Sequence, residues 1–376
     1  MDFKKKIRDI VTLSSANIAA AIILGFFWLF LATYIEKTEY GELGYYMSIV
    51  NVAVAISMLG LRGTVVVYEA KNENIFPASF IVVLISSSIT SAVTYILTNN
   101  AAISMLIIGM TIFFITLSGL NSKFRYMDIS VHVIIRVIIA VFLALILYQF
   151  YGIDGILFGF FLASFLILKE LRSLVKNKEI NFSLLKSKIK FILHVWSNRL
   201  AAVLFWWGDK IIIGYLFGFS ILANYHLAVQ YVLLIDTIPR SVSQYLLPQE
   251  SSGKKNKKIK IFSIIISSII AIVSIISIPY IIDYFLPEYH DSILPMQIMS
   301  IAIIPLAIAM IQQSEFLGKE NSRIVLLGSL IQTGVYFTLL VVLGQMLEVV
   351  GFAIGFLASI IIRVLVNLIM KKYLHE

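Results

Sequence analysis

Long apolar segments follow one another through this chain, and they constrain its fold more than any other feature of the sequence. Each is close to the ~20 residues that a helix needs to cross the hydrocarbon core of a bilayer. Twelve such segments run over residues 11–34, 41–61, 76–98, 101–120, 130–150, 152–168, 194–218, 221–243, 261–282, 292–312, 324–346 and 349–370. The sequence therefore predicts an all-α integral membrane protein with twelve transmembrane helices.

Lysine and arginine are concentrated in every second loop between these segments. With the N-terminus placed in the cytoplasm, 24 of the 30 basic residues lie on the cytoplasmic side, Arg62 among them, and only Lys37 lies in an outer loop. Such an excess of positive charge is typical of cytoplasmic loops, because it sets the orientation in which the helices insert. We therefore expect a multi-pass protein of the cell (plasma) membrane with both termini in the cytoplasm.

The composition excludes several other classes of protein. With 60% hydrophobic and 14% charged residues, the chain has too little polar surface for a soluble domain. The net charge of +9 lies mostly in cytoplasmic loops, where it contacts anionic membrane lipids, so nucleic acid is not an expected partner. The chain has no cysteine, and its five histidines form no ligand-spaced cluster, so neither a metal nor a cofactor is predicted. It also lacks the GxxxxGK[ST] loop of direct ATP hydrolysis.

The longest polar interval divides the twelve segments evenly. Residues 169–190 carry seven basic residues among short apolar ones. We predict an N-terminal six-helix bundle over 1–168, a cytoplasmic linker over 169–193 and a C-terminal six-helix bundle over 194–376. The sequence favours an interfacial amphipathic helix and a plain connecting loop about equally for the linker.

The two halves resemble copies of each other. Asn17 aligns with Asn198 and, without a gap, Tyr34 aligns with Tyr215; after a two-residue shift, Tyr46 aligns with Tyr225. Because each half has an even number of helices, both would enter from the same side and be related by a pseudo-two-fold axis along the membrane normal. This is a parallel-repeat transporter architecture, whose substrate path is expected in the cleft between the halves near mid-membrane.

Two groups of residues resemble a known family. The first comprises residues 29–34 (LFLATY), 39–46 (EYGELGYY) and 59–61 (LGL), and the second comprises 208–214 (GDKIIIG), 223–228 (ANYHLA) and 246–248 (LLP). They resemble helices one and two, and helices seven and eight, of the Wzx-like polysaccharide-biosynthesis flippases, whose superfamily also holds MATE drug exporters and lipid II flippases. The resemblance implies a MATE-like fold and the translocation of a lipid-linked (polyprenyl-pyrophosphate) oligosaccharide, such as an O-antigen unit. Members of the family commonly have fourteen helices, two more than this chain is predicted to have.

Ionisable residues within apolar segments are functional candidates, because each charge at a helix centre costs about 2.5 to 3.5 kcal/mol on insertion scales. In the seventh segment Arg199, Trp206 and Lys210 follow, together with Val203, the spacing of a single helical stripe. The candidate substrate-binding residues are Arg136, Arg199, Lys210, Arg240, Arg363, Asn17, Asn198 and Trp206, and the candidate ion-coupling acids are Asp209 and Asp236.

Structural roles compete with these assignments. The stripe of Arg199 and Lys210 faces either the substrate or a structural ion partner. Arg136 is placed to line a cavity or to extend its side chain toward the membrane surface, and the latter is favoured for Arg363. Asp236 and Arg240 have the i, i+4 spacing that favours an intrahelical ion pair.

Embedded cations outnumber embedded acids, so the predicted cleft prefers an anion. Arginine and lysine bind phosphate oxygens through charge-assisted hydrogen bonds, which suits a pyrophosphate between a lipid and a glycan. We therefore predict a flippase, and not an enzyme, in which Arg199 and Arg136 engage the phosphates and Lys210 holds them. Expected partners are the lipid-linked oligosaccharide, membrane lipids and a glycan polymerase or transferase of the same pathway.

Two other functions compete with this prediction. A MATE-type antiporter of cationic drugs would need an embedded carboxylate, and the first six segments place none at mid-membrane. A membrane-bound glycosyltransferase or polymerase would carry catalytic acids in outer loops, which are short here.

Overall fold

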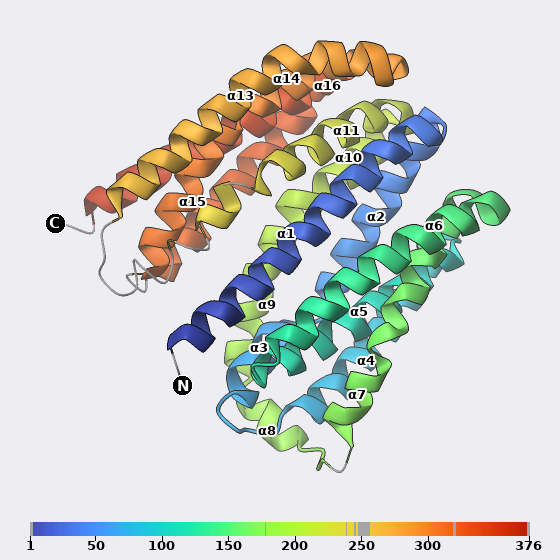
Figure 1. The fold of residues 1–376 in the computed structure, drawn as a ribbon, viewed down its shortest axis with the longest axis vertical. Coiled ribbons are helices and arrows are strands. Elements are labelled where there is room, and N and C mark those ends of the chain that lie inside the picture. The colour runs from blue at the N-terminus through green and yellow to red at the C-terminus, as the bar shows by residue number, and fades with distance from the viewer. Residues whose placement is uncertain are drawn as a thin grey trace. The chain divides into compact units, whose positions relative to one another are not determined.

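A computed structural model of the chain describes residues 3–176, 178–237, 239–243, 246, 256–318 and 321–373 (Figure 1). Every regular element in these ranges is helical. Eight of the described helices are long and apolar enough to cross a membrane, or nine if a bent pair is counted as one span. The prediction of an all-α, multi-pass membrane protein is confirmed, while the number twelve stays a prediction. Leu247 and Pro248 of the sequence motif lie outside the described residues.

The helices pack into two compact units. Unit 1 comprises Met1–Leu24 and Tyr46–Gly208, and unit 2 comprises Gly25–Tyr45 and Asp209–Glu376. The boundaries fall inside helices α1 (Phe3–Tyr34) and α2 (Lys37–Ser57), so each of these helices contributes to both units.

Unit 1 is built around α5. Its buried face packs against α3, α4 and α6. The helices of unit 1 after α2 are α3 (Leu61–Glu69), α4 (Phe76–Thr98), α5 (Ala101–Ser122), α6 (Tyr126–Ala163), the 3₁₀ turn η1 (Ser164–Ile167), α7 (Leu168–Val175), α8 (Phe182–Ser187), α9 (Ile189–Val203) and the π-helical turn η2 (Leu204–Gly208).

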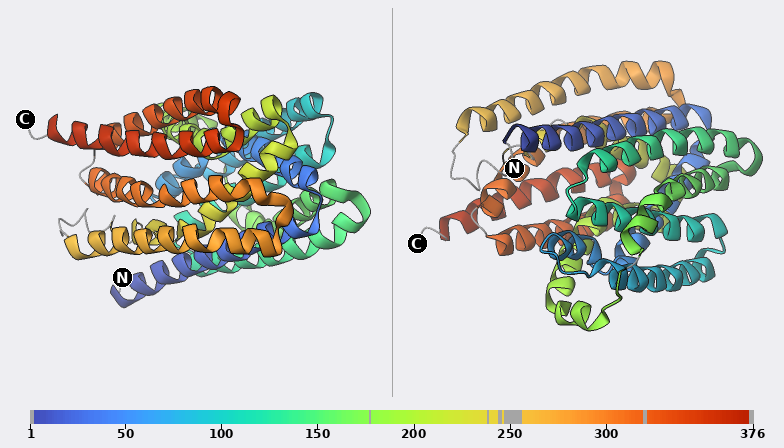
Figure 2. Two further views of the ribbon diagram at one scale, coloured as in Figure 1. Left: turned by 90° about the horizontal axis from the view of Figure 1, so that it is seen from above. Right: turned by 60° about the horizontal axis from the view of Figure 1, so that its bottom comes forward.

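Unit 2 is built around α11, in which residues 222–230 are all buried. This helix packs against α10, α14 and α16. Figures 1 and 2 show the long helices α13, α15 and α16 running beside one another. The elements of unit 2 are α10 (Asp209–Phe217), α11 (Phe219–Ile235), α13 (Lys257–Phe285), the 3₁₀ turn η3 (Pro287–Ser292), α14 (Ile293–Ile301), α15 (Ile303–Gly318) and α16 (Ser322–Tyr373).

Helix α6 is a hairpin of two helices and not a single rod. Gly152 has a φ of 56°, and a Cβ built on Gly155 would lie 2.1 Å from the carbonyl oxygen of Leu147. Residues eight apart in a straight helix are separated by about 12 Å, so the chain must fold back here. Gly159 continues the close approach, because its Cβ would lie 2.5 Å from the nitrogen of Ala144. The predicted division between segments 130–150 and 152–168 is confirmed.

Helix α16 reverses in the same way. Glu348 has a φ of 47°, and a Cβ on Gly351 would lie 2.2 Å from the carbonyl oxygen of Leu343, again eight residues earlier. Gly355 follows four residues later, as Gly159 follows Gly155 in α6. Both units therefore contain a hairpin closed by a GxxxG pair, which extends the internal repeat beyond the residues that the sequence alignment uses.

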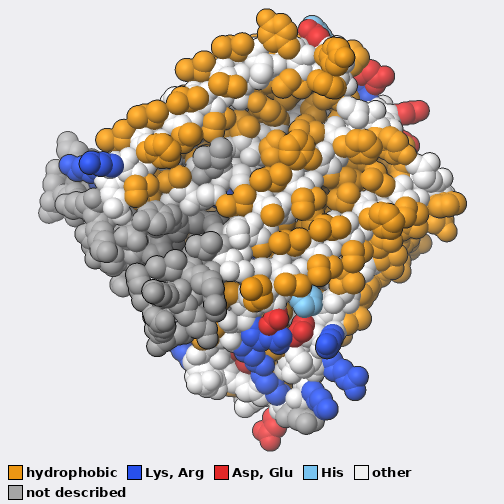
Figure 3. All heavy atoms as spheres, viewed as in Figure 1, with side chains coloured by type: hydrophobic (Ala, Val, Ile, Leu, Met, Phe, Trp, Pro, Cys, Tyr) orange, Lys and Arg blue, Asp and Glu red, His pale blue; other side chains and the backbone are white. Residues whose placement is uncertain are grey.

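The linker region forms two short helices, α7 and α8, rather than one. Lys178 pairs with Glu69 at 3.2 Å and Lys188 pairs with Glu73 at 2.7 Å, so ion pairs hold this region to the α3–α4 connection. On the face drawn in Figure 3, apolar side chains cover the long helices, and Lys and Arg of unit 1 gather at the end where α7 and α8 lie. The exposed bases of these two helices are Lys169, Arg172 and Lys186.

Candidate functional site

Unit 1 contains a cavity of about 480 Å³, within the usual size range of ligand sites. Helices α2, α3, α5 and α9 and the π-helical turn form its walls. The polar and aromatic residues that line it are Asn51, Arg62, Phe114, Ser118, Arg199 and Trp207. The described residues that line it include Arg62 and Arg199 but no Asp or Glu, so their net charge is positive.

Arg62 reaches this cavity because the chain bends sharply in front of it. Helices α2 and α3 meet at an angle of 47°, and Gly60, between them, has a φ of 76°. A Cβ on Gly60 would lie 2.4 Å from the carbonyl oxygen of Ile192, so only glycine lets α3 begin against the backbone of α9. The guanidinium of Arg62 then lies over the ring of Phe114, 4.7 Å from its centroid.

The sequence predicts Arg62 in a loop on the cytoplasmic side. In the structure it lies in the first turn of helix α3 and lines a cavity of unit 1, while the side of the membrane stays a prediction. The signal that could have found it is the run Gly60-Leu61-Arg62-Gly63, because two glycines around an arginine mark a helix break at which backbones approach closely.

Arg199 enters the same cavity from α9. The indole nitrogen of Trp196 donates a hydrogen bond to the carbonyl of Ala55 at 3.2 Å, which holds α9 against α2. The side chains of Arg62 and Arg199 are both exposed, and no carboxylate in the described part of the chain forms an ion pair with either. Two like charges that share a small cavity repel each other unless an anion lies between them.

The π-helical turn Leu204–Gly208 changes which residues follow Arg199 into the cavity. A π turn adds one residue to the ordinary helical repeat, so the register advances by one position. Val203 lines the cavity as the predicted stripe requires, but Trp207 lines it in place of Trp206, which packs edge-on against Phe205. The predicted stripe is therefore wrong beyond Val203.

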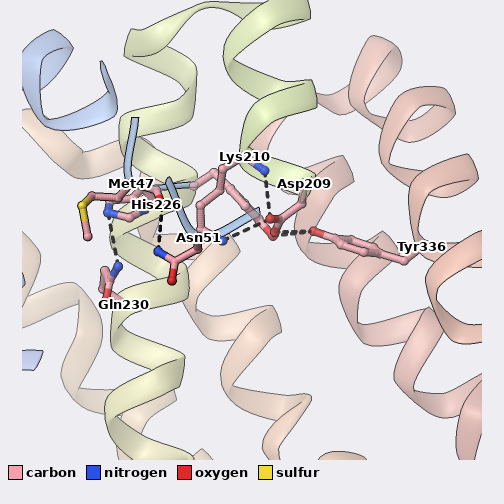
Figure 4. Close-up of polar contacts among 8 residues, drawn as sticks. Met47, Asn51, Asp209, Lys210, His226, Gln230 and Tyr336 are labelled. Carbon is pink, nitrogen blue, oxygen red and sulfur yellow. Dashed lines mark hydrogen bonds and ion pairs between the residues drawn. The ribbon is translucent and has the colours of Figure 1, made fainter. Parts of the chain in front are cut away.

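Lys210, the last member of that stripe, belongs to unit 2 and is enclosed there. Its Nζ lies 3.1 Å from Oδ1 of Asp209, and its backbone nitrogen donates to the same oxygen at 2.8 Å. The hydroxyl of Tyr225 donates to Oδ2 of Asp209. The hydroxyl of Tyr336 also lies within hydrogen-bond distance of that oxygen (Figure 4), and its single proton goes either there or to the hydroxyl of Tyr225. Lys210 is 1% and Asp209 is 2% exposed. A buried, fully hydrogen-bonded ion pair of this kind fixes the start of α10 within unit 2.

Two further candidates form the predicted intrahelical ion pair. Nη2 of Arg240 lies 2.5 Å from Oδ2 of Asp236, four residues earlier, and Asp236 is fully buried. The spacing of these two residues thus predicts their pairing correctly.

The remaining candidates lie apart from the cavity. Arg136 is buried in unit 1 over the ring of Phe113, 4.6 Å from its centroid, and Arg363 donates hydrogen bonds to glutamines of unit 2. Asn17 is exposed, and the amide of Asn198 donates to the carbonyl of His194 at 3.0 Å. Of the ten candidate residues, Arg199 alone is among the described residues that line the cavity, and the roles of all ten stay predictions.

We compared the chain with known protein families, sequences and solved structures. No protein-family model and no curated protein sequence matches the chain. The lipid II flippase MurJ, in an inward closed conformation, superposes with a TM-score of 0.64 over 97% of this chain and 81% of its own, at 15% identity. The chain has the fold of the MOP-superfamily transporters.

Two other solved structures agree with this fold. A multidrug resistance MATE transporter of the MOP superfamily, inward-facing, gives a TM-score of 0.62 at 14% identity and covers 96% of this chain and 94% of its own. A MOP superfamily transporter from Pyrococcus furiosus gives 0.55 at 12% identity, covering 97% and 95%. At these identities the likeness shows the fold, and the MATE-like fold predicted from the sequence is confirmed.

Proposed function

We propose that this protein is a flippase that moves a lipid-linked oligosaccharide, carried on polyprenyl pyrophosphate, from the cytoplasmic to the outer leaflet for surface polysaccharide or glycan assembly. The main support for the proposal is the cavity of unit 1, in which Arg62 and Arg199 contribute two positive charges and no acid lies among the described lining residues. The fold that the chain shares with a lipid II flippase also supports the proposal of a flippase.

The chemistry of the cavity suits the headgroup of such a lipid. Each guanidinium of Arg62 and Arg199 can donate paired hydrogen bonds that match phosphate oxygens, and among the described residues no carboxylate forms an ion pair with either of them. The ring of Trp207 offers an apolar face on which a sugar ring can pack, and Ser118 and Asn51 offer polar groups for its hydroxyls. In this proposal Arg62 takes the phosphate-binding role for which Arg136 and Lys210 are candidates from the sequence, because both of those are buried elsewhere.

The proposed transport involves no covalent step. The headgroup enters the cavity from the cytoplasmic side, the two arginines hold its phosphates away from the hydrocarbon, and the lipid tail stays in the bilayer. Opening of the cavity toward the outer side then releases the headgroup, and the affinity of the arginines for phosphate lowers the cost of carrying charge across the membrane. Membrane lipids and the enzymes that assemble or polymerise the glycan are the expected partners.

A MATE-type cation antiporter is the second candidate, since MATE transporters share the fold. Arg62 and Arg199 would repel a cationic drug, and the carboxylate of Asp209 is already surrounded within unit 2 by two donors of Lys210 and the hydroxyls of Tyr225 and Tyr336. For the Pyrococcus furiosus transporter, reversed polarity of the binding pocket has been taken to suggest a different function. The sign of the charge in the cavity is therefore the property that separates the two candidates.

The test is flipping of a fluorescent lipid-pyrophosphate oligosaccharide by the purified protein in proteoliposomes. We expect the wild type to flip it and an Arg62→Gln, Arg199→Gln double variant to lose this activity. Arg172→Gln, which removes an exposed charge on α7, is the matched control and keeps it. Flipping that persists in the double variant, or uptake of an organic cation in place of the lipid, would overturn the proposal.

A further inference from the structure

Arg363 is a cation inside unit 2 without an acidic partner. It lies in the second arm of α16, where its Nη1 donates to Oε1 of Gln332 at 3.1 Å and its Nη2 donates to Oε1 of Gln313 at 2.8 Å. Both acceptors are neutral amides. Within the described residues no carboxylate forms an ion pair with Arg363, so its charge is hydrogen-bonded but not neutralised.

Two donors beside this contact have no acceptor. Nε of Arg363 and Nε2 of Gln332 are both buried and make no hydrogen bond to the described protein. Gln332 is only 2% exposed, so bulk water does not serve its amide. The orientation of that amide is fixed, because turning it over would set two donors, Nε2 and the guanidinium, against each other. The site therefore has a surplus of N–H donors around one uncompensated positive charge.

The neighbouring amides do not relieve this surplus. Asn367 donates from Nδ2 to Oε1 of Gln312 at 3.0 Å, and Gln312 donates to the carbonyl of Val364 at 3.3 Å. Oδ1 of Asn367 is turned toward Gly328, where a Cβ would lie 2.6 Å from it, and it makes no hydrogen bond in the described protein. This second chain of amides supplies no negative charge to Arg363.

The other embedded cations of unit 2 show what is missing. Lys210 pairs with Asp209, and Arg240 pairs with Asp236. A charge within a membrane segment is expensive unless it is paired, and a buried donor without an acceptor adds a further cost. An anion paired with Arg363 is therefore expected, but the described chain provides none.

We propose that Arg363 and Gln332 form a binding site for a small monovalent anion, chloride in the cell, inside unit 2. Nε of Arg363 and Nε2 of Gln332 are its donors. One negative charge balances the single guanidinium, and a halide accepts several N–H bonds without demanding a fixed geometry. The bound anion would tie the two arms of α16 to each other and, through Gln313, to α15. This inference is independent of the lipid flippase proposed above, because it concerns other residues in the other unit.

The first test is thermal unfolding of the purified full chain in detergent, with chloride replaced stepwise by gluconate at constant ionic strength. The Tm of the wild type should rise with chloride, in proportion to the logarithm of its concentration once this exceeds the Kd of the site, since a ligand that binds only the folded state stabilises it by RT ln(1 + [L]/Kd). Bromide should act as chloride does. A wild-type Tm that is the same in chloride and gluconate would overturn the proposal, as would stabilisation by phosphate but not by halides.

The decisive variant is Gln332→Glu, which places a carboxylate beside the guanidinium with almost no change of shape. It should unfold in gluconate at a higher temperature than the wild type does in gluconate, and its Tm should no longer respond to chloride. Arg323→Gln removes an exposed charge from the same helix and should keep the full chloride response. A Gln332→Glu variant as chloride-dependent as the wild type would refute the site.

A direct readout is anomalous diffraction from bromide-soaked crystals of the wild type. A peak within hydrogen-bond distance of Nε of Arg363 is expected, and it should be missing in Gln332→Glu. A wild-type map without that peak counts against the proposal even if chloride shifts the Tm, because the shift would then come from another site.

Discussion

The backbone of Gly41 in α2 lies directly against the carbonyl oxygen of Phe219 at the start of α11. A Cβ built on Gly41 would be 1.9 Å from that oxygen and 3.0 Å from the nitrogen of Ala223. Both contacts are with main-chain atoms, which cannot move aside without displacing the helix. Glycine at this position therefore lets two helices of unit 2 pack backbone to backbone.

The first prediction is that Gly41→Ala destabilises the protein. Overpacking of a tight interior typically costs about 1–3 kcal/mol, and the upper end is expected here because the obstacle is backbone. Gly334→Ala in α16 is the control, since nothing lies within 4 Å of its Cβ and alanine favours a helix. Unfolding in detergent, followed by tryptophan fluorescence, compares the two. Equal stability of Gly41→Ala and the wild type would contradict the packing seen at α2 and α11.

The second prediction concerns Gly60, whose φ of 76° and close approach to Ile192 position Arg62. Gly60→Ala should reduce transport about five- to thirtyfold, because an L-residue in the left-handed region costs about 1–2 kcal/mol and each 1.4 kcal/mol is a factor of ten. Gly63→Ala is the matched control and should reduce transport less, since its Cβ would meet only a methyl of Val195 at 2.9 Å. Initial flipping rates of the two variants in proteoliposomes measure this difference. A ranking with Gly63→Ala as the more harmful change would show that the bend does not set the cavity.

The third prediction is that Arg62 and Arg199 act on the same group of the substrate. If both hold the pyrophosphate, either single change to Gln removes most of the benefit of the pair, so the double variant should be less impaired than the two single effects combined. Lysine at either position should restore part of the rate, because it keeps the charge but not the paired hydrogen bonds. A double-mutant cycle on the flipping rate measures this coupling. Strict additivity would separate the two arginines into independent sites.

Much of the fold is readable from the sequence because lipid imposes simple rules. Apolar runs of the right length predict the spans, and a Gly just before a GxxxG run marks the turn of the α6 hairpin at Gly152. The α16 hairpin turns at Glu348, a residue that rarely takes a positive φ, yet the hydropathy pattern still divides the segment correctly there.

The site was less predictable, for reasons that lie in local geometry. The hydropathy pattern assigns Arg62 to a loop because it carries no information on the bend between α2 and α3 at Gly60, which places the arginine at the cavity. The stripe from Arg199 to Lys210 assumes a regular helix, and the π turn at 204–208 breaks that assumption by one residue. Lys210 and Asp209 are adjacent in sequence, yet only the fold reveals that Tyr225 and Tyr336 complete their network.

The last prediction separates a structural from a transport role for Asp209 and Lys210. Because both side chains are buried and paired, removing one partner should cost about 3–5 kcal/mol, since it leaves the other charge buried and alone. Asp209→Asn or Lys210→Met should each lower the yield of folded protein, whereas the double variant should recover most of the stability, because no charge is then left unpaired. Transport by the stable double variant is the informative measurement. If Asp209 couples an ion to transport, the double variant folds but its flipping rate no longer responds to an ion gradient. If the pair is purely structural, the flipping rate of the double variant matches that of the wild type under every gradient.

Poor folding of the double variant, comparable with that of either single variant, would show that Tyr225 and Tyr336 depend on the carboxylate itself and not on the balance of charge.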